Sequence, residues 1–371
     1  EECIKMVTTE AIQGALSQVM DPELNQDLVS LGMIGSLSIN DDVVQLRVDL
    51  TTPACPLKDK IEADVRAALE PLGISKLDLS FGAQVRNQSS GQAHLLSGIK
   101  NIIAVGAGKG GVGKSTVAVN LAASLASYGA SVGILDGDLY GPSLPTMLNI
   151  CGPPQVTADK KLLPIVRHGL KAVTMGSFVA KDQALVWRGP MLNNALRQFF
   201  SDVVWGELDY LVIDLPPGTG DIPLSLAQMI PVGAALIVTT PQAVAIDDVR
   251  RAKSMFDQLK IPVAGLVENM AGFTPPGSDD IIPIFGEGGG QQAAQEFGVP
   301  FLGSLPIDPN VRICGDGGMP VVLEDRESPV SQALDAMARG LAGRLSVLAE
   351  TGQSPTRPIP VDKSGKPGCA K

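Results

Sequence analysis

The sequence is poor in aromatic residues, in histidine and in basic residues. Phe, Trp and Tyr make up 4% of the 371 residues, there are two histidines, and 39 acidic residues outnumber 29 basic ones. The net charge of −10 disfavours binding to nucleic acid or to an anionic membrane, since both require a basic face. No apolar run is long enough to span a bilayer. We therefore expect neither nucleic acid nor membrane among the partners.

Cysteine is also scarce, and its positions are scattered. The five cysteines are odd in number, and none is paired at the spacing of metal ligands, so the sequence suggests no disulfide framework. A reducing compartment is the simplest interpretation. The five positions are Cys3, Cys55, Cys151, Cys314 and Cys369.

Glycine and proline, by contrast, are abundant. The 41 glycines and 28 prolines accompany a hydrophobic content of 44% and a mean hydropathy of +0.19. This composition is typical of a folded protein with the many turns of an α/β fold. The length is sufficient for one large and one small domain.

The strongest motif is a glycine-rich stretch at residues 108–116. It follows an apolar run at 102–105, predicted to be a buried strand, and precedes a predicted helix at 117–128, which is the context of a phosphate-binding loop. Glycines let backbone N–H groups approach phosphate oxygens, and the helix N-terminus adds its positive dipole end. Lys114 can reach the β- and γ-phosphates, and the Ser115 hydroxyl can bind Mg²⁺. The other residues expected around ATP are Gly108, Gly110, Gly111, Val112, Gly113 and Thr116.

Two further predicted strands end in acidic residues. The run at 131–136 ends in Asp136 and is followed by Asp138, and the run at 210–214 ends in Asp214. Acidic residues at the carboxyl end of a parallel strand fall at the ligand edge of an open sheet. There Asp214 would hold Mg²⁺ through water. Because strands alternate with helices, we predict an α/β fold with a doubly wound, mostly parallel sheet.

The N-terminal residues predict a separate small α+β domain. Hydrophobic periodicity predicts a helix to Met20, strands at 34–39 and 43–50, a helix at 57–69 and a strand at 76–81. A terminal amphipathic helix is expected at 330–348. The predicted boundaries are 1–82 for the α+β domain, 83–98 for a flexible linker, 99–350 for the P-loop ATPase domain and 351–371 for a disordered tail.

The KGGVGKST form of the phosphate loop resembles the deviant Walker A class, which includes the nitrogenase iron protein, MinD/ParA and the Mrp/ApbC ATPases. This resemblance implies that Lys109 crosses a homodimer interface to the nucleotide of the partner. It also implies that Asp138 orients the attacking water and that Asp136 supports the Mg²⁺ shell. Lys109 and Lys114 would stabilise the charge that develops during hydrolysis.

Residues 101–345 resemble the Mrp/ApbC iron–sulfur cluster carriers almost throughout. The supporting stretches include Gly-Pro-Ser at 141–143, Arg-Gly-Pro-Met at 188–191 and Glu-Asn-Met at 268–270. The resemblance implies that Asn269 reads adenine, and we expect residues 305–308 to close the base pocket. It further implies an ATP-dependent carrier that holds a [4Fe-4S] cluster and transfers it to apoproteins.

The N-terminal domain resembles the small iron–sulfur-assembly domain of SufT-like proteins. The resemblance rests on Asp-Pro-Glu at 21–23, Leu-Gly-Met at 31–33 and Thr-Thr-Pro-Ala-Cys-Pro-Leu at 51–57. In that family the cysteine of this turn, here Cys55, is the suspected cluster contact. A position just before a helix start favours the thiolate, the metal-binding form. The alternative is that Cys55 is a small buried hydrophobic residue.

One departure from the carriers concerns the cluster ligands. Most Mrp-type carriers place a Cys-x-x-Cys pair shortly after Glu-Asn-Met, and the aligned positions here are Pro275 and Ser278. A symmetric four-thiolate site at the dimer axis is therefore absent at that place. The plastid and cyanobacterial-type scaffolds also lack the pair and share the N-terminal module. The remaining candidate ligands are Cys55 and, second to it, Cys314, which we expect in a glycine-rich loop.

The leading hypothesis is an ATP-hydrolysing scaffold or carrier for iron–sulfur clusters that acts as a homodimer on apo client proteins. Two alternatives stay open. A MinD/ParA-like positioning ATPase is disfavoured because the sequence lacks a basic amphipathic C-terminal helix. A cluster-free, nucleotide-dependent interaction switch is suggested by Pro275 and Ser278. We expect a cytoplasmic location, or the plastid stroma if a leader preceded Glu1.

Overall fold

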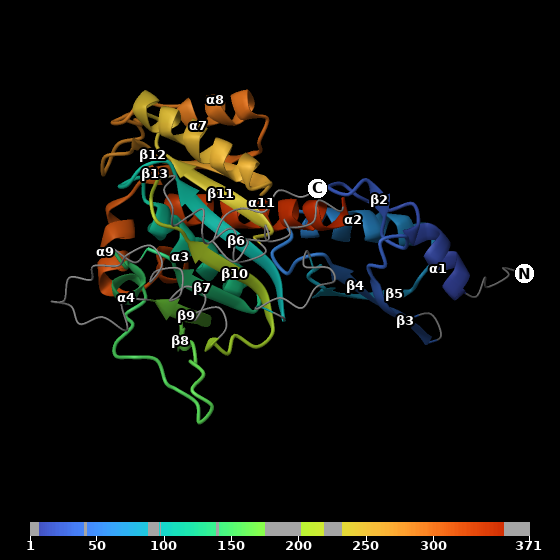
Figure 1. Ribbon diagram of the computed structural model, residues 1–371. Coiled ribbons are helices and arrows are strands. Elements are labelled where there is room, and N and C mark those ends of the chain that lie inside the picture. The colour runs from blue at the N-terminus through green and yellow to red at the C-terminus, as the bar shows by residue number, and fades with distance from the viewer. Residues whose placement is uncertain are drawn as a thin grey trace, which may run out of the picture. The chain divides into compact units, whose positions relative to one another are not determined.

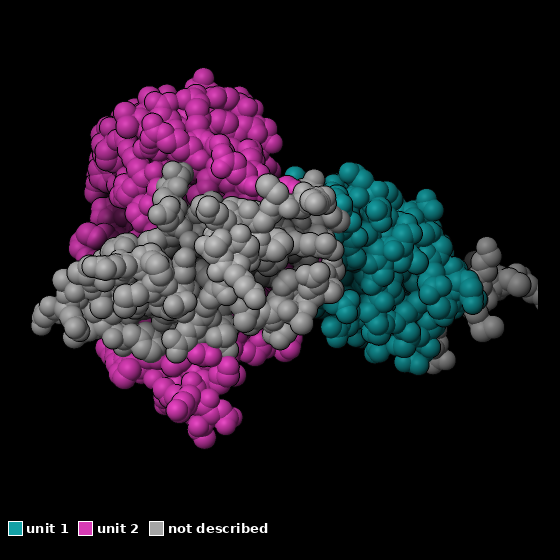
Figure 2. Space-filling view, viewed as in Figure 1, with its two compact units in different colours: residues 1–86, 342–352 teal, residues 87–341, 353–371 magenta. Residues whose placement is uncertain are grey.

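The computed structural model describes residues 7–40, 43–87, 96, 98–138, 141–174, 202–218 and 232–351. These residues form two compact units, which are coloured separately in Figure 2. Unit 1 comprises residues 1–86 and 342–352, and unit 2 comprises residues 87–341 and 353–371. The predicted tail from residue 352 on, and most of the predicted linker, lie outside the described residues. The predicted domain boundaries at 82 and 350 stay predictions.

Unit 1 is built around a three-stranded sheet with the order β3-β4-β5. Strands β3 and β4 pair antiparallel, whereas β4 and β5 pair parallel because α2 connects them. The alternating side chains Val44, Leu46 and Val48 are buried against Ile61 and Val65 of α2. The elements are α1 (Thr9–Leu16), β1 (Met20–Asp21), β2 (Gln26–Asp27), β3 (Ile34–Asn40), β4 (Val43–Leu50), α2 (Lys58–Leu69), the 3-10 helix η1 (Glu70–Leu72) and β5 (Lys76–Ala83).

The first helix is shorter than predicted. It begins at Thr9, with Thr8 as N-cap, but ends at Leu16 instead of continuing to Met20. Met20 and Asp21 instead pair with β2, and the Asp21 carboxylate accepts hydrogen bonds from the backbone of Glu23 (2.9 Å) and Leu24 (3.0 Å). Local side-chain bonding of this kind competes with helix and favours a turn.

Unit 2 contains an eight-stranded sheet with the order β13-β12-β11-β6-β10-β7-β9-β8 (Figure 1). All neighbouring strands pair parallel except β8 and β9, so the doubly wound, mostly parallel sheet is confirmed. The strands are β6 (Ile99–Ala107), β7 (Val132–Asp136), β8 (Ile165–Arg167), β9 (Leu170–Thr174), β10 (Leu208–Asp214), β11 (Ala234–Thr239), β12 (Val263–Phe273) and β13 (Phe301–Ile307). The helices are α3 (Lys114–Ser127), α4 (Leu144–Met147), α7 (Ala243–Gln258), α8 (Gly289–Phe297), α9 (Pro309–Gly317), α10 (Val321–Glu324) and α11 (Pro329–Glu350), of which residues 342–350 belong to unit 1.

An apolar core lies between this sheet and helices α7 and α8. Ile102, Leu211 and Ile237 from three strands are buried together with Phe256 of α7 and Ala293 of α8. Near-continuous apolar runs are what a parallel strand needs, because helices cover both of its faces. Within the described residues, no helix is both long and apolar enough to cross a membrane.

The register of the parallel strands aligns their carboxyl ends. Asp214 at the end of β10 lies opposite Val105 of β6 on one side and Asp136 of β7 on the other. Asp136 in turn lies opposite Thr174, the last residue of β9. Three polar side chains from separate strands therefore share one row at the edge where the phosphate loop leaves β6.

Candidate functional site

The predicted phosphate loop connects β6 to α3 and requires glycine for steric reasons. Gly111 and Gly113 have φ values of +81° and +84°, a region that other residues rarely adopt. A Cβ atom on Gly108 would lie 2.4 Å from the carbonyl carbon of Asp248 in α7. One on Gly113, the N-cap of α3, would lie 2.2 Å from Nδ2 of Asn269. A side chain at position 108 or 113 would therefore clash with these neighbours, and glycine lets the loop reach the N-terminus of α3.

Two predicted residues that follow or end the neighbouring strands β6 and β10 form a buried ion pair. Nζ of Lys114 lies 2.5 Å from Oδ1 of Asp214 and 3.2 Å from Oγ of Ser115. The Lys114 side chain is 6% exposed and that of Asp214 is not exposed at all. Burial raises the pKa of Asp214, and the Lys114 ammonium opposes that shift.

The groups around Asp214 fit a magnesium ion. Oδ2 of Asp214 is buried and has no hydrogen-bond partner among the described residues, which is costly unless a ligand satisfies it. The Ser115 hydroxyl lies beside the same ion pair. Carboxylate and hydroxyl oxygens are hard ligands of the kind that Mg²⁺ binds, often through water.

Asp136 is also buried, but its carboxylate is bonded within the protein. Oδ1 accepts a hydrogen bond from the backbone of Asp138 (3.1 Å), and Oδ2 accepts from the backbone of Leu144 (3.2 Å) and the hydroxyl of Thr174 (3.2 Å). Burial, and then the neighbouring Asp214 carboxylate, raises the pKa of Asp136 to about 7. Asp136 therefore organises the segment that follows β7.

Asp138 and Lys109 lie at the same edge of unit 2. The Asp138 side chain is half-buried, and its Oδ1 accepts a hydrogen bond from the backbone of Gly141 (3.2 Å). Nζ of Lys109 donates to Oε1 of Gln242 (3.3 Å), the N-cap residue of α7. Lys109 thus contacts a side chain of its own protomer.

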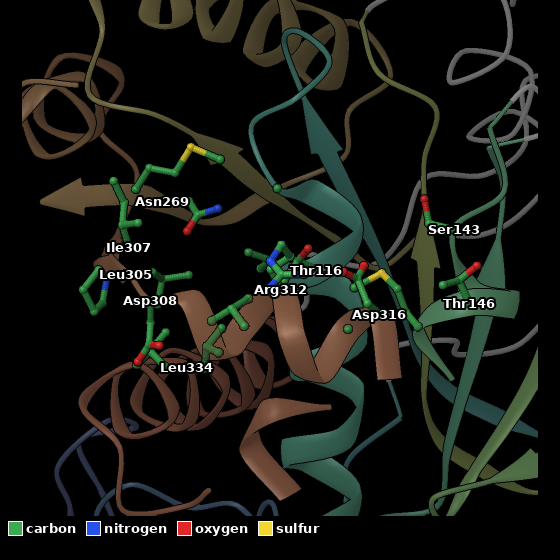
Figure 3. A pocket seen from close by; sticks show the side chains of 18 of the residues that line it. Thr116, Ser143, Thr146, Asn269, Leu305, Ile307, Asp308, Arg312, Asp316 and Leu334 are labelled. Carbon is green, nitrogen blue, oxygen red and sulfur yellow. Dashed lines mark hydrogen bonds and ion pairs between the residues drawn. The ribbon is translucent and has the colours of Figure 1, made fainter. Parts of the chain in front are cut away.

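A cavity of about 740 Å³ adjoins the phosphate loop (Figure 3). Gly113 and Thr116 line it beside Asn269 at the end of the buried part of β12, and Leu305, Pro306, Ile307 and Asp308 line it at the end of β13. Nδ2 of Asn269 donates to the carbonyl of Val112 (2.9 Å), which holds the amide in one orientation. Figure 3 shows Ile307 and Asp308 on the Asn269 side of the cavity and Ser143 and Thr146 on the opposite side.

The candidate cluster ligand Cys55 lies in a different environment. Its side chain is 6% exposed and belongs to the apolar core of unit 1, two residues before Leu57, which is the N-cap of α2. Thr52 is also buried, and its hydroxyl accepts from the backbone of Ala54 (3.2 Å). Among the described residues, no three His, Cys, Asp or Glu side chains are grouped so that they could hold a metal ion.

The expectation for Cys314 is wrong, because this residue lies within α9 and not in a glycine-rich loop. Asp308 caps the helix by accepting from the backbone of Asn310 (2.7 Å), Pro309 follows it, and Gly318 closes the helix with a φ of +76°. These are standard start and stop signals, which the abundance of glycine obscured. Burial raises the pKa of the Cys314 thiol, which disfavours the thiolate.

Pro275 and Ser278 follow β12 in a turn, where the backbone of Ser278 donates to the carbonyl of Pro275 (3.1 Å).

Sequence reasoning missed three polar residues at the carboxyl edge of the unit 2 sheet, which we call the nucleotide edge. Thr174 bonds Asp136, Gln242 bonds Lys109, and Arg312 lines the cavity. The His168-Gly169 pair could have predicted the hairpin of β8 and β9, because the two residues form a two-residue turn with positive φ. Thr174 is the last residue of the second strand of that hairpin.

Comparison with known proteins agrees with this arrangement. Residues 98–342 match the family model of the NUBPL iron-transfer P-loop NTPase, and residues 9–75 match that of an iron–sulfur cluster assembly protein. The chain is 52% identical over 341 residues to the iron-sulfur cluster carrier protein of Deinococcus radiodurans, covering 91% of this chain and 96% of that protein. It is 44% identical over 342 residues to the chloroplastic Fe-S cluster assembly factor HCF101 of Arabidopsis thaliana, covering 89% of this chain and 63% of that protein.

Among solved structures, a nucleotide-binding protein from Archaeoglobus fulgidus in complex with ADP is similar, with a TM-score of 0.55 and 38% identity. The similarity covers 63% of this chain and 91% of that protein. The family models together span most of both units, and the alignment with the Deinococcus radiodurans protein covers most of both chains. The chain therefore belongs to the iron–sulfur cluster carrier family of P-loop NTPases, with an iron–sulfur cluster assembly domain at its N-terminus.

Proposed function

We propose that this chain binds and hydrolyses Mg-ATP at the carboxyl edge of the unit 2 sheet. The observation that carries the proposal is the buried pair of Lys114 and Asp214, with one Asp214 oxygen unsatisfied beside the phosphate loop. In the structure the two charges of this pair neutralise each other. When ATP binds, Lys114 would move to the β- and γ-phosphates, and Asp214 and Ser115 would hold Mg²⁺, which supplies charge neutralisation there.

The orientation of Asn269 supports recognition of adenine. Its Nδ2 is committed to the Val112 carbonyl, so its Oδ1 is the atom left to meet a base. An acceptor oxygen complements the exocyclic amine of adenine. The Gly108–Thr116 loop would surround the phosphates through Gly108, Gly110, Gly111, Val112, Gly113 and Thr116.

Hydrolysis would use charge stabilisation and positioning more than covalent chemistry. Lys114 would stabilise the charge that develops on the γ-phosphate, and Asp138 would orient the attacking water. Lys109 contacts Gln242 of its own chain, so reaching the nucleotide of a partner in a homodimer requires that contact to break. Asp136 would support the Mg²⁺ shell indirectly, because its oxygens already accept hydrogen bonds from the protein.

The cargo we propose is an iron–sulfur cluster, of the [4Fe-4S] type, delivered to apo client proteins. The family membership supports this cargo, and Pro275 and Ser278 separate the chain from carriers with a Cys-x-x-Cys pair. The N-terminal module makes Cys55 the proposed ligand, with one thiolate from each subunit of a homodimer and exogenous ligands completing the coordination. Relatives occur in bacteria and in chloroplasts, which supports the cytoplasm or the plastid stroma as the location.

Two measurements test this function. Calorimetry of the full chain with ATP and with ADP, each with and without Mg²⁺, should give magnesium-dependent binding. Anaerobic reconstitution with iron and sulfide, followed by transfer to an apo client, should load the wild-type chain and leave a Cys55→Ser variant depleted. Normal loading of that variant would place the cluster elsewhere. No iron after anaerobic purification would favour the cluster-free switch, the alternative motivated by Pro275 and Ser278.

A further inference from the structure

Thr174 ends a row of buried polar groups that begins at the phosphate loop. The register places Asp214, Asp136 and Thr174 side by side at the ends of β10, β7 and β9. Thr174 is 1% exposed, Asp136 is 1% exposed and Asp214 is fully buried. Because β10 and β9 flank β7, Lys114 and Asp214 lie on one side of Asp136 and the Thr174 hydroxyl lies on the other.

Asp136 fixes the backbone at two points of the segment that follows β7. Its Oδ1 accepts from the backbone of Asp138 (3.1 Å), and its Oδ2 accepts from the backbone of Leu144 (3.2 Å), where α4 begins. Between those points, the Asp138 carboxylate accepts from the backbone of Gly141 (3.2 Å). The orientation of the Asp138 carboxylate therefore depends on where the Asp136 carboxylate is held.

The attraction of Lys114 acts on Asp136 from the opposite side. A carboxylate that accepts two backbone hydrogen bonds can still rotate about its terminal torsion, which is broad. The Thr174 hydroxyl, at 3.2 Å from Oδ2, adds a third donor from a strand whose position the sheet fixes. That donor opposes rotation of Asp136 towards Lys114.

We propose that Thr174 is a positioning residue for ATP hydrolysis. By holding Asp136, it keeps the Asp138 and Leu144 amides, and through them the Asp138 carboxylate, in the arrangement that orients water. Thr174 is not among the residues that line the cavity beside the phosphate loop, so we expect it to act on turnover and not on nucleotide affinity. This proposal rests on the proposed function of unit 2 and adds a residue that no motif identifies.

The test compares Thr174→Val, which keeps the shape and removes the hydroxyl, with Thr174→Ser, which keeps the hydroxyl. Hydrogen exchange of peptides covering residues 137–147 is measured in the ligand-free full chain. Thr174→Val should exchange about fivefold faster there, because the lost bond weakens local protection, whereas the 108–116 peptide should be unchanged. Thr174→Ser should match the wild type in both peptides.

Turnover gives the second measurement. Thr174→Val should lower kcat about fivefold while leaving the Kd of Mg-ADP within about twofold, because the group positions water and not nucleotide. In an Asp138→Ala background the same substitution should have no further effect on kcat. Equal behaviour of the Val and Ser variants, or a loss of nucleotide affinity that matches the loss of kcat, would overturn the proposal. A wild-type chain that neither binds nor hydrolyses ATP would refute the function of unit 2 and the catalytic part of this proposal, and the exchange data would still decide whether Thr174 holds the segment at 137–147.

Discussion

The two candidate sites of this chain bury their reactive groups in opposite ways. At the nucleotide edge of unit 2, the charged side chains Lys114, Asp136 and Asp214 are buried together, and they compensate one another or accept backbone hydrogen bonds. In unit 1, Cys55 lies within an apolar core, and no metal-binding group of three side chains exists among the described residues. Burying charge is expensive, so a cluster of buried charges indicates a ligand site more strongly than a buried thiol does.

The difference also concerns how complete each site is before its ligand arrives. The nucleotide edge already has its glycine loop, its lysine and an unsatisfied Asp214 oxygen in place. A cluster bound through Cys55 needs further ligands from a second subunit or from solution. We therefore expect substitutions at the nucleotide edge to have larger effects on the ligand-free protein than substitutions at Cys55.

The largest effect is expected from Lys114→Met. It leaves Asp214 buried without its partner, which should destabilise unit 2 by about 3–5 kcal/mol, and it should lower ATP hydrolysis by about 100-fold or more. Urea unfolding followed by tryptophan fluorescence measures the stability, because both tryptophans of the sequence, Trp187 and Trp205, lie between residues 87 and 341. The matched control is Lys114→Met combined with Asp214→Asn, which should recover most of the stability and none of the activity. A single variant as stable as the wild type would show that the pair does not form in the ligand-free protein.

A pH dependence should come next in size. The pKa of Asp136 rises from 3.8 to about 7 in the folded protein, so folding favours the protonated carboxyl. Its contribution to stability is fully present below about pH 4 and is lost as the pH rises to about 7, by at most about 4 kcal/mol. Asp214, whose pKa is also raised, contributes in the same direction. Urea unfolding at pH 5 and pH 8 should therefore show a larger decline for the wild type than for Asp136→Asn, and equal declines would contradict the assignment.

Cys55→Ala should have a smaller effect on stability and a selective effect on function. Removing one buried sulfur from the unit 1 core should cost about 1 kcal/mol. Hydrogen exchange of β4 and α2 measures this cost, since unit 1 contains no tryptophan. Iron loading should fall while the affinity for Mg-ADP stays unchanged. A drop in nucleotide affinity would mean that the two sites are not independent, and the comparison between them would fail.

The smallest effect is expected at an exposed ion pair, which gives a reference for the energy of the buried pair. Arg250 of α7 and Glu296 of α8 form an exposed ion pair with an N···O distance of 2.8 Å, similar to that of Lys114 and Asp214. Because water screens the exposed pair, a double-mutant cycle with Arg250→Ala and Glu296→Ala should give a coupling energy below about 1 kcal/mol. A coupling as large as that between Lys114 and Asp214 would show that distance, and not burial, decides the strength of these pairs.

The local sequence determined most of the elements and the identity of the nucleotide motifs. The phosphate loop, the strand ends at Asp136 and Asp214 and the helices α2, α3 and α11 follow from glycine placement and hydrophobic period, which are properties of neighbouring residues. The end of α1, the hairpin of β8 and β9 and the helix around Cys314 were not predicted. Their signals are short side-chain caps and two-residue turns, which are weak beside the long apolar runs.

Only the tertiary structure decided which of these residues meet. Lys114 and Asp214 are 100 positions apart, and Thr174 becomes a partner of Asp136 because β9 pairs with β7 in a register that no local pattern reveals. Whether a carboxylate binds a metal, a lysine or a backbone amide depends on which strands are neighbours and how deeply water is excluded from them. Strand order and burial are set by the packing of the whole sheet. The sequence therefore determines which functional groups are present, and the fold determines which of them contact one another.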